Sequence, residues 1–186
     1  LADTITKGKR TVLEKAKAIY DWTCENTYRN PDILGCGAGD VCKFLKDPGG
    51  KCVDISSTFV ALSRAAGVPS RDIFGIRLGK TPQDDITQKQ HCWAEFYLPG
   101  YGWVPVDPAD VRKMMLEQKL AISDPKILEK MDYYFGNLDP YRMKLSEGRD
   151  LKLNPPQNGD EVYYLMYPFA QIGDETLDDL NPENFK

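Results

Sequence analysis

The order of periodic segments along the chain restricts the class of fold. Helical patterns come first, because apolar side chains recur at helical spacing over residues 9–26 and again over residues 53–66. Strand-like runs come later, at 71–78, 91–98 and 103–107. Helices followed by strands predict an α+β fold, in which the helices pack on an antiparallel sheet.

The remaining segments are less regular. Residues 28–51 are rich in glycine, aspartate and proline, and they predict a long loop with one helical turn over Val41–Leu45. Beyond residue 110 the patterns predict helices and then strands, at 111–121, 125–135, 141–145, 150–153 and 162–172. No internal repeat or obvious linker divides the sequence, so residues 1–186 are predicted to form a single domain.

The composition excludes two classes of partner. The chain has 28 acidic and 24 basic residues, a net charge of −4 and no dense stripe of lysine and arginine, so nucleic acid is not expected to bind. The apolar runs are short and none reaches the length of a membrane span. The first residue is Leu1 rather than methionine, from which we expect that an upstream segment has been removed.

Cys52 lies at the N-terminus of the second predicted helix, after two glycines in the stretch GGKCVDISSTFVALSRAAGVPSR. A helix N-terminus directs unpaired N–H groups and the positive end of its dipole at such a sulfur, which favours the thiolate. The same N–H groups suit a developing oxyanion. Cys52 is therefore a candidate nucleophile, and a small buried apolar side chain is the alternative interpretation.

His91 is the only histidine of the chain, so a Cys–His mechanism has no other imidazole to use. It opens the predicted strand 91–98, in which alternation puts four side chains on one face: His91, Trp93, Glu95 and Tyr97. This face is a plausible lining for a substrate cleft, with Trp93 as a candidate contact. The alternative is a structural histidine at the start of a strand.

Asp107 ends the strand-like run WVPVD and is the candidate for orienting the imidazole. Its position depends on the register of the hairpin, because a slip of one residue inverts the faces. Pairing Leu98 with Trp103 would put Asp107 behind the sheet from His91. Pairing Tyr97 with Trp103 would put it on the same face, diagonal to His91. A catalytic triad requires the second register.

Three blocks of sequence resemble the core of the transglutaminase-like superfamily, in its bacterial form. They are Gly-x-Cys opening a helix that ends in Gly-Val-Pro-x-Arg (50–71), His-x-Trp on a strand (91–93) and Gly-Trp-x-x-x-Asp-Pro (102–108). The resemblance covers residues 16–110 and marks them as the catalytic core. Residues 111–186 are then a C-terminal extension of helices and strands that packs on this core.

The resemblance implies a papain-like cysteine protease fold with Cys52 as nucleophile, His91 as general base and acid, and Asp107 holding the imidazole. It implies acyl transfer through a thioester, with hydrolysis of a peptide or amide bond favoured over transamidation. The expected partner is a peptide or protein substrate. A binding or scaffolding module that kept the fold without the chemistry is the alternative, but no member of the triad is missing.

The resemblance leaves the oxyanion donor open. The backbone N–H of Cys52 is the first candidate, and Tyr28, Asn26 and Asn30 are side-chain candidates. No cofactor is expected, and calcium dependence does not carry over because no carboxylate cluster has the spacing of a calcium loop.

The other cysteines bear on the cellular compartment. Cysteine spacings that lack a C-x-x-C pair argue against zinc and against a redox protein. A disulfide between Cys36 and Cys42 is favoured, Cys24 could pair in the same region or stay buried, and Cys92 is expected to be inert in the core. The odd count of five favours a periplasmic or extracellular protein, with a cytoplasmic one as the alternative.

Overall fold

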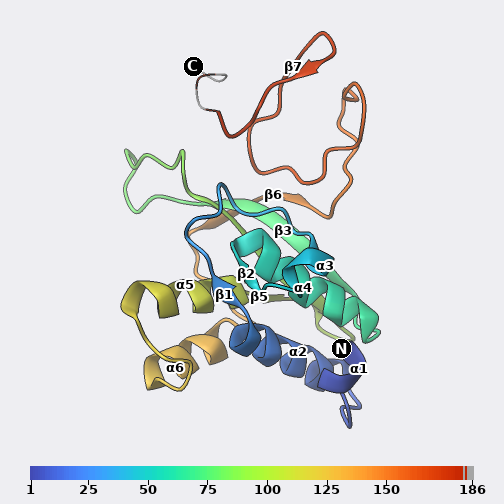
Figure 1. The fold of residues 1–186 in the computed structure, drawn as a ribbon, viewed down its shortest axis with the longest axis vertical. Coiled ribbons are helices and arrows are strands. Elements are labelled where there is room, and N and C mark those ends of the chain that lie inside the picture. Colours follow the sequence, from blue (N-terminus) through green and yellow to red (C-terminus); the bar gives the residue numbers. More distant parts are fainter. Residues whose placement is uncertain (182, 184–186) are drawn as a thin grey trace. The chain divides into compact units, whose positions relative to one another are not determined.

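The computed structural model describes residues 1–181 and 183 of the chain. Its helices are α1 (Ala2–Ile5), α2 (Val12–Asn26), α3 (Val41–Phe44), α4 (Cys52–Ala65), α5 (Pro108–Gln118) and α6 (Pro125–Tyr133). Its strands are β1 (Tyr28–Arg29), β2 (Gly49–Gly50), β3 (Ser70–Arg77), β4 (Gln90–Leu98), β5 (Gly102–Val106), β6 (Arg142–Glu147), β7 (Gln171–Ile172) and β8 (Glu175–Thr176). Helices precede most of the sheet along the chain, which confirms the predicted α+β class (Figure 1).

The main sheet has the strand order β5-β4-β3-β6, and its pairs β4–β5 and β3–β6 are antiparallel. Two smaller pairs, β1–β2 and β7–β8, lie outside it. The chain divides into two compact units. Unit 1 consists of Leu1–Asp72 and Cys92–Pro140, and unit 2 consists of Ile73–His91 and Tyr141–Lys186.

Helix α2 of unit 1 begins at Val12 rather than at residue 9, because Thr11 caps it. The Thr11 hydroxyl accepts the N–H of Glu14 at 3.2 Å, and the Glu14 carboxylate accepts the N–H of Thr11 at 2.9 Å. This reciprocal pair is a capping box and satisfies two otherwise unpaired donors. The predicted amphipathic face is confirmed at Ala16 and Ile19, which are fully buried, but Leu13, which belongs to the same pattern, is 45% exposed.

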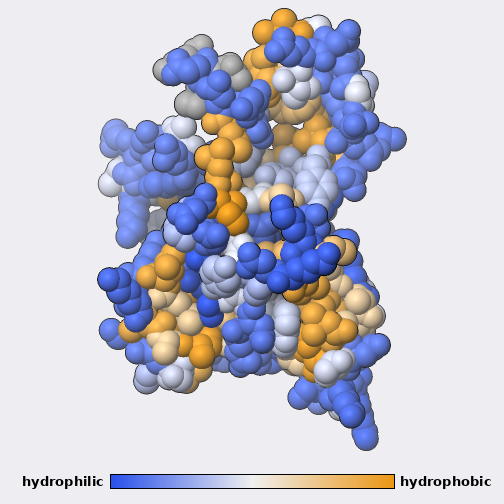
Figure 2. Space-filling model, viewed as in Figure 1, coloured by the Kyte–Doolittle hydropathy of each residue, from blue (hydrophilic) through white to orange (hydrophobic). Residues whose placement is uncertain are grey.

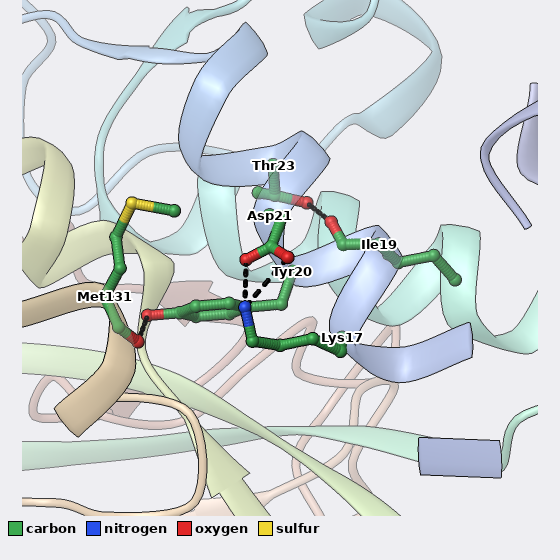
Figure 3. Close-up of polar contacts among 6 residues, drawn as sticks. All are labelled: Lys17, Ile19, Tyr20, Asp21, Thr23 and Met131. Carbon is green, nitrogen blue, oxygen red and sulfur yellow. Dashed lines mark hydrogen bonds and ion pairs between the residues drawn. The ribbon is translucent and has the colours of Figure 1, made fainter. Parts of the chain in front are cut away.

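Tyr20 connects α2 to another helix of unit 1 (Figure 3). Its ring is fully buried and its hydroxyl donates to the backbone carbonyl of Met131 in α6, at 3.0 Å. Figure 3 also shows two contacts within α2: the hydroxyl of Thr23 donates to the carbonyl of Ile19 at 2.7 Å, and Lys17 pairs with Asp21 at 2.6 Å. The bond from Tyr20 satisfies its hydroxyl inside an apolar core.

Helix α4 is the central helix of unit 1 and starts one residue earlier than predicted. Its residue Phe59 is fully buried and meets Phe96 of β4 edge to face, with ring centroids 6.5 Å apart. The helical turn predicted at Val41–Leu45 is present as α3, capped by Asp40, whose carboxylate accepts the N–H of Lys43 at 3.0 Å. The structure therefore confirms the predicted elements around Cys52.

Unit 2 contains less regular structure than the sequence predicted. The prediction of strands at 150–153 and 162–172 is wrong. Leu151 and Val162 form one isolated bridge, and within these two ranges only Gln171–Ile172 is a short strand. Two physical reasons account for this. Pro168 cannot donate to a strand ladder, and Tyr164 stacks on Phe74, with centroids 5.0 Å apart, instead of alternating across a sheet.

Within residues 1–181 and 183, no helix combines the length and the apolar character needed to cross a membrane. Figure 2 shows hydrophobic side chains on the visible face in separate patches among hydrophilic ones.

Candidate active site

Cys52 is the first residue of α4 and only 2% exposed. The preceding Gly50 belongs to β2, which pairs in parallel with β1. A side chain at Gly50 would overlap Asp54 and Phe44. The glycine is thus required by close packing and not by a left-handed backbone conformation, since its φ is not positive.

Asp54 fixes the surroundings of Cys52. Its carboxylate accepts the N–H of Lys51 at 2.9 Å and the N–H of Gly39 at 2.8 Å, so it joins the long loop to the first turn of α4. The loop also supplies the carbonyl of Cys36, which accepts the N–H of Val53 at 2.9 Å. One of the donors at the N-terminus of α4 is therefore already used by the loop.

The Cys52 thiol donates to the carbonyl of Cys36 at 3.9 Å. Cys92 lies on β4 next to His91 and is 1% exposed, in the core as the sequence predicted. Burial first, and then the neighbouring Cys52 thiol, raise the pKa of Cys92 well above its ordinary value.

The hairpin of β4 and β5 takes the register that a triad requires. Tyr97 pairs with Trp103, and the register continues without a shift to Ala94 and Val106. Asp107 follows directly after Val106. Because paired residues share a face, Asp107 continues the row toward Trp93 and lies diagonal to His91.

Asp107 is fully buried and caps α5. One carboxylate oxygen accepts the N–H of Asp110 at 2.9 Å, and the backbone N–H of Asp107 donates to the carbonyl of Tyr134 at 3.1 Å. A nitrogen of His91 and one carboxylate oxygen from each of Asp107 and Asp110 all lie within 4.8 Å of one another. A buried carboxylate at that range can orient an imidazole and stabilise its protonated form.

Asp110 is a member of this group that the sequence reasoning missed. It is 8% exposed and lies in the first turn of α5. The signal was present in the sequence DPAD, because an N-cap aspartate reaches the N–H of the third helical residue and so brings the two carboxylates together. An imidazole and two carboxylates at this spacing also have the ligand types that could hold a metal ion.

Two weaker candidates have well-defined positions. The Tyr28 ring packs over Gly49, and its hydroxyl donates to Asp47 at 3.2 Å, which raises the pKa of Tyr28. Its role as an oxyanion donor stays a prediction. Trp93 is only 4% exposed, so the side chain expected to line a cleft is largely covered.

The expected disulfide between Cys36 and Cys42 is absent, and all five cysteines, which the structure describes in full, are thiols. The reason lies in the orientation of the loop. Cys36 is buried beside the first turn of α4, where its carbonyl accepts the N–H of Val53, whereas Cys42 is exposed on α3.

A charged and aromatic cluster lies along β3, β4 and β5 in unit 1. The Arg71 guanidinium stacks 4.0 Å above the Trp103 ring and contacts the Glu95 carboxylate at 2.8 Å. Tyr97 meets Trp103 edge to face at 5.5 Å. Glu95 and Tyr97 alternate with core residues as predicted, but the sequence reasoning did not identify Arg71 as their partner.

The chain is similar to proteins of several bacteria. An uncharacterized protein of Haemophilus influenzae is 41% identical over an alignment of 199 positions, which covers 96% of this chain and 54% of that protein. A protein-glutamine gamma-glutamyltransferase of Pseudomonas aeruginosa is 33% identical over 91 residues, which cover 45% of this chain and 14% of the enzyme. The chain thus spans about half of the first relative and a much smaller part of the second.

The fold has a counterpart among solved structures. The periplasmic domain of TgpA from Pseudomonas aeruginosa matches with a TM-score of 0.51 and 24% identity, over 63% of this chain and 43% of that domain. This likeness shows a transglutaminase-like, papain-like fold. A family model described as the transglutaminase-like superfamily matches residues 1–108. The chain therefore belongs to the transglutaminase-like superfamily.

Proposed function

We propose that this chain is a thiol-dependent acyl-transfer enzyme with Cys52 as nucleophile, His91 as general base and acid, and Asp107 as the carboxylate that orients the imidazole. The observation that carries the proposal is the distance of less than 4.8 Å between a nitrogen of His91 and a carboxylate oxygen of the fully buried Asp107. It is supported by the position of Cys52 at the N-terminus of α4, where the helix dipole favours a thiolate.

The proposed reaction has two halves. His91 takes the proton of the Cys52 thiol, the sulfur attacks the carbonyl carbon of a peptide or carboxamide, the C–N bond breaks, and the leaving amine takes that proton from His91. Water or a primary amine then attacks the thioester, gives a proton to His91 and releases Cys52. We propose hydrolysis as the main outcome, because water is present at far higher concentration than any amine.

The oxyanion is proposed to receive its hydrogen bond from the backbone N–H of Cys52. The neighbouring donor of Val53 is engaged by the carbonyl of Cys36 at 2.9 Å, so it is the weaker candidate. Tyr28 is proposed as a second donor only if its hydroxyl exchanges Asp47 for the substrate.

The relatives suggest the substrate class and the compartment. The Pseudomonas aeruginosa enzyme is named for transfer of a glutamyl group from protein-bound glutamine, so a glutamine carboxamide is a proposed acyl donor for this chain too. The periplasmic domain that shares the fold agrees with our expectation of a location outside the cytoplasm.

The test is the rate at which iodoacetamide labels each cysteine, read by peptide mass mapping from about pH 5 to about pH 9. We expect Cys52 to react well below its ordinary pKa of about 8.5 and to slow in His91→Ala. In parallel, dimethylated casein is the acyl donor, and ammonia release is measured with and without a fluorescent primary amine.

Matched variants make the test specific. Cys52→Ala should abolish ammonia release, whereas Cys42→Ala, which removes an exposed thiol on α3, should leave it unchanged. Cys52 labelling that is no faster than that of Cys42 and is unaltered in His91→Ala would contradict the proposal and favour a binding module.

A further inference from the structure

Unit 1 exposes three aromatic side chains on one hairpin, and the proposed mechanism uses none of them. Tyr97 of β4 and Trp103 of β5 are each 41% exposed, and Tyr101 in the turn between the strands is 85% exposed. Single exposed apolar side chains are ordinary on a protein surface, whereas a group of neighbouring ones is typical of an interaction site. Tyr97 and Trp103 are neighbours, because they pair directly across the two strands.

The rings of Tyr97 and Trp103 form a corner and not a flat platform. Their centroids are 5.5 Å apart and their planes meet at 73°. One face of the Trp103 indole is already covered, since the Arg71 guanidinium lies 4.0 Å from its centroid. A flat ligand such as a sugar ring therefore cannot stack on that face. A compact apolar group can instead contact both rings of this aromatic corner.

An ion pair holds the aromatic corner in place. Two nitrogens of Arg71, Nε and Nη2, each contact the same carboxylate oxygen of Glu95 at 2.8 Å. The pair fixes Arg71 against Trp103 before a ligand arrives, so less side-chain freedom is lost on binding. Glu95 also neutralises the charge of Arg71. The aromatic corner is therefore better suited to an uncharged group than to an acidic peptide or a phosphate.

The aromatic corner lies on the same face of the hairpin as part of the candidate active site. The register runs without a shift from Tyr97 and Trp103 to Ala94 and Val106, and Asp107 comes next. Trp103 precedes Asp107 by four residues, so alternation puts both on one face, about 13 Å apart along the strand. An extended or polyproline II peptide rises about 3.1–3.4 Å per residue. The aromatic corner is thus about four peptide residues away from a group held beside Asp107.

We infer that the aromatic corner of Tyr97 and Trp103 binds a proline of the substrate, about four residues from the residue whose carbonyl reacts. Proline fits because its ring is compact, apolar and uncharged, and its restricted backbone loses little freedom on binding. Aromatic-lined grooves bind proline-containing peptides for the same reasons. The inference rests on the proposed function only in placing the reacting group beside Asp107, and the binding itself needs no chemistry.

The experiment uses the full chain with Cys52→Ala and pairs of fluorescent peptides with a central glutamine. The two peptides of a pair differ only in having proline or alanine about four residues from the glutamine, on either side. By fluorescence anisotropy we expect the proline peptide to bind about tenfold more tightly, the size of one good aromatic contact. Adding Trp103→Ala or Tyr97→Ala should make the two peptides bind equally. Tyr101→Ala, the matched control, removes an exposed ring of the same hairpin and should keep the difference.

Kinetics with active enzyme give a second readout. The preference for proline should appear in KM and not in kcat, because a contact far from the reacting carbonyl acts equally on the bound substrate and the transition state. Trp103→Ala should bring the KM values of the two peptides together. A structural defect would instead lower kcat for both peptides alike.

Equal binding of the two peptides to the Cys52→Ala protein, or a preference that survives in Trp103→Ala, would overturn the inference. Binding of chitotriose that Trp103→Ala abolishes, with no difference between the peptides, would assign the surface to a glycan. A dimer that the same variant makes monomeric would assign it to a second copy, and each of these results overturns the inference too. If Trp103→Ala does not fold, which circular dichroism would reveal, the peptide pairs and Tyr97→Ala decide.

The two proposals can fail separately. A proline preference in binding, together with no ammonia release by the wild type, refutes the proposed function alone. Ammonia release without any proline preference refutes this inference alone.

Discussion

In unit 1, Tyr20, Phe59 and Phe96 are each fully buried and join helices α2 and α4 to strand β4. In unit 2, Phe74 is the one fully buried aromatic ring among its described residues, and Tyr163 is 45% exposed. The two regions thus differ in how much apolar surface they remove from water, which is the dominant favourable term in folding.

Unit 2 relies on polar contacts to fix its loops. The side chain of Gln171 donates to the carbonyl of Asn158 at 2.9 Å and accepts the N–H of Asn158 at 2.9 Å. Arg149 lies over the rings of Tyr163 and Phe74, at 4.5 and 5.4 Å from their centroids. Exposed contacts of this kind contribute little each, so unit 2 should open at a lower free energy than unit 1. The comparison predicts that unit 1, which contains Cys52 and Asp107, carries most of the stability.

The largest expected effect concerns Asp107, a residue of unit 1 whose carboxylate is part of the candidate site. Asp107→Asn keeps an oxygen for capping α5 but removes the charge beside His91, and we expect a rate of acyl transfer about 10⁴-fold lower with little change in stability. Asp107→Ala should lose the same rate and in addition about 1 kcal/mol of stability from the missing cap. Casein deamidation measures the rate of acyl transfer and urea unfolding measures the stability, so the two assays separate the lost charge from the lost cap. Full activity in Asp107→Asn would remove Asp107 from the mechanism.

The second prediction compares two fully buried phenylalanines. Phe59→Ala should lower the free energy of global unfolding by about 3–5 kcal/mol, because the core around α4 cannot refill the cavity. Phe74→Ala should act within unit 2 and speed amide exchange there. The free energy of global unfolding should stay nearly constant. Urea unfolding and hydrogen exchange with residue resolution give the two readouts. Equal global losses for both variants would show that the units unfold together.

The third prediction concerns alkaline pH and unit 1. Burial raises the pKa of Cys24 in the folded chain, whereas the unfolded thiol ionises near about 8.5. The folded state therefore binds more protons above that pH, and stability falls as pH rises, by up to about 1.4 kcal/mol per pH unit for this thiol. Cys24→Ala should flatten the decline and Cys42→Ala, an exposed position, should not. Parallel slopes for all three proteins would contradict the prediction.

The smallest effect is expected in unit 2. Gln171→Ala removes the pair of bonds to Asn158 and should cost about 1 kcal/mol or less, because these groups are exposed and water replaces the partner. The change should appear as faster amide exchange in residues 151–176 and not in global unfolding. Lys152→Ala is the control, since its exposed pair with Glu161 at 3.3 Å should contribute little. A lower free energy of global unfolding in Gln171→Ala would mean that the amide contacts stabilise this unit more than burial does.

The elements that the sequence predicted best are those whose side-chain period coincides with burial. Helix α2 and the β4–β5 hairpin are such cases, and pairing Tyr97 with Trp103 could be put forward because only that register serves a triad. The run 162–172 misled the prediction because its aromatic residues suit a strand in isolation, while the structure packs Tyr164 flat on Phe74. Local propensity is overridden there by a tertiary contact.

The candidate site also has parts that the sequence could predict and parts that it could not. Asp110 follows from a capping pattern in neighbouring residues and was predictable. How α4, which carries Cys52, packs on β4, which carries His91, depends on tertiary contacts such as that between Phe59 and Phe96, which no single segment reveals. The disulfide expected at Cys36 failed for a related reason, because the chain uses that loop to cover the start of α4.

The close packing of Gly37 and Gly50 against Asp54 has a consequence for engineering the loop that precedes α3. A side chain at Gly37 or Gly50 would collide with the Asp54 carboxylate, and Gly37 also has a φ of +95°. Loops of other lengths should therefore be grafted between Asn30 and Leu34, where Asp32 and Leu34 are exposed, and not between Cys36 and Gly39. The part of the loop with the smallest side chains is the part that tolerates replacement least.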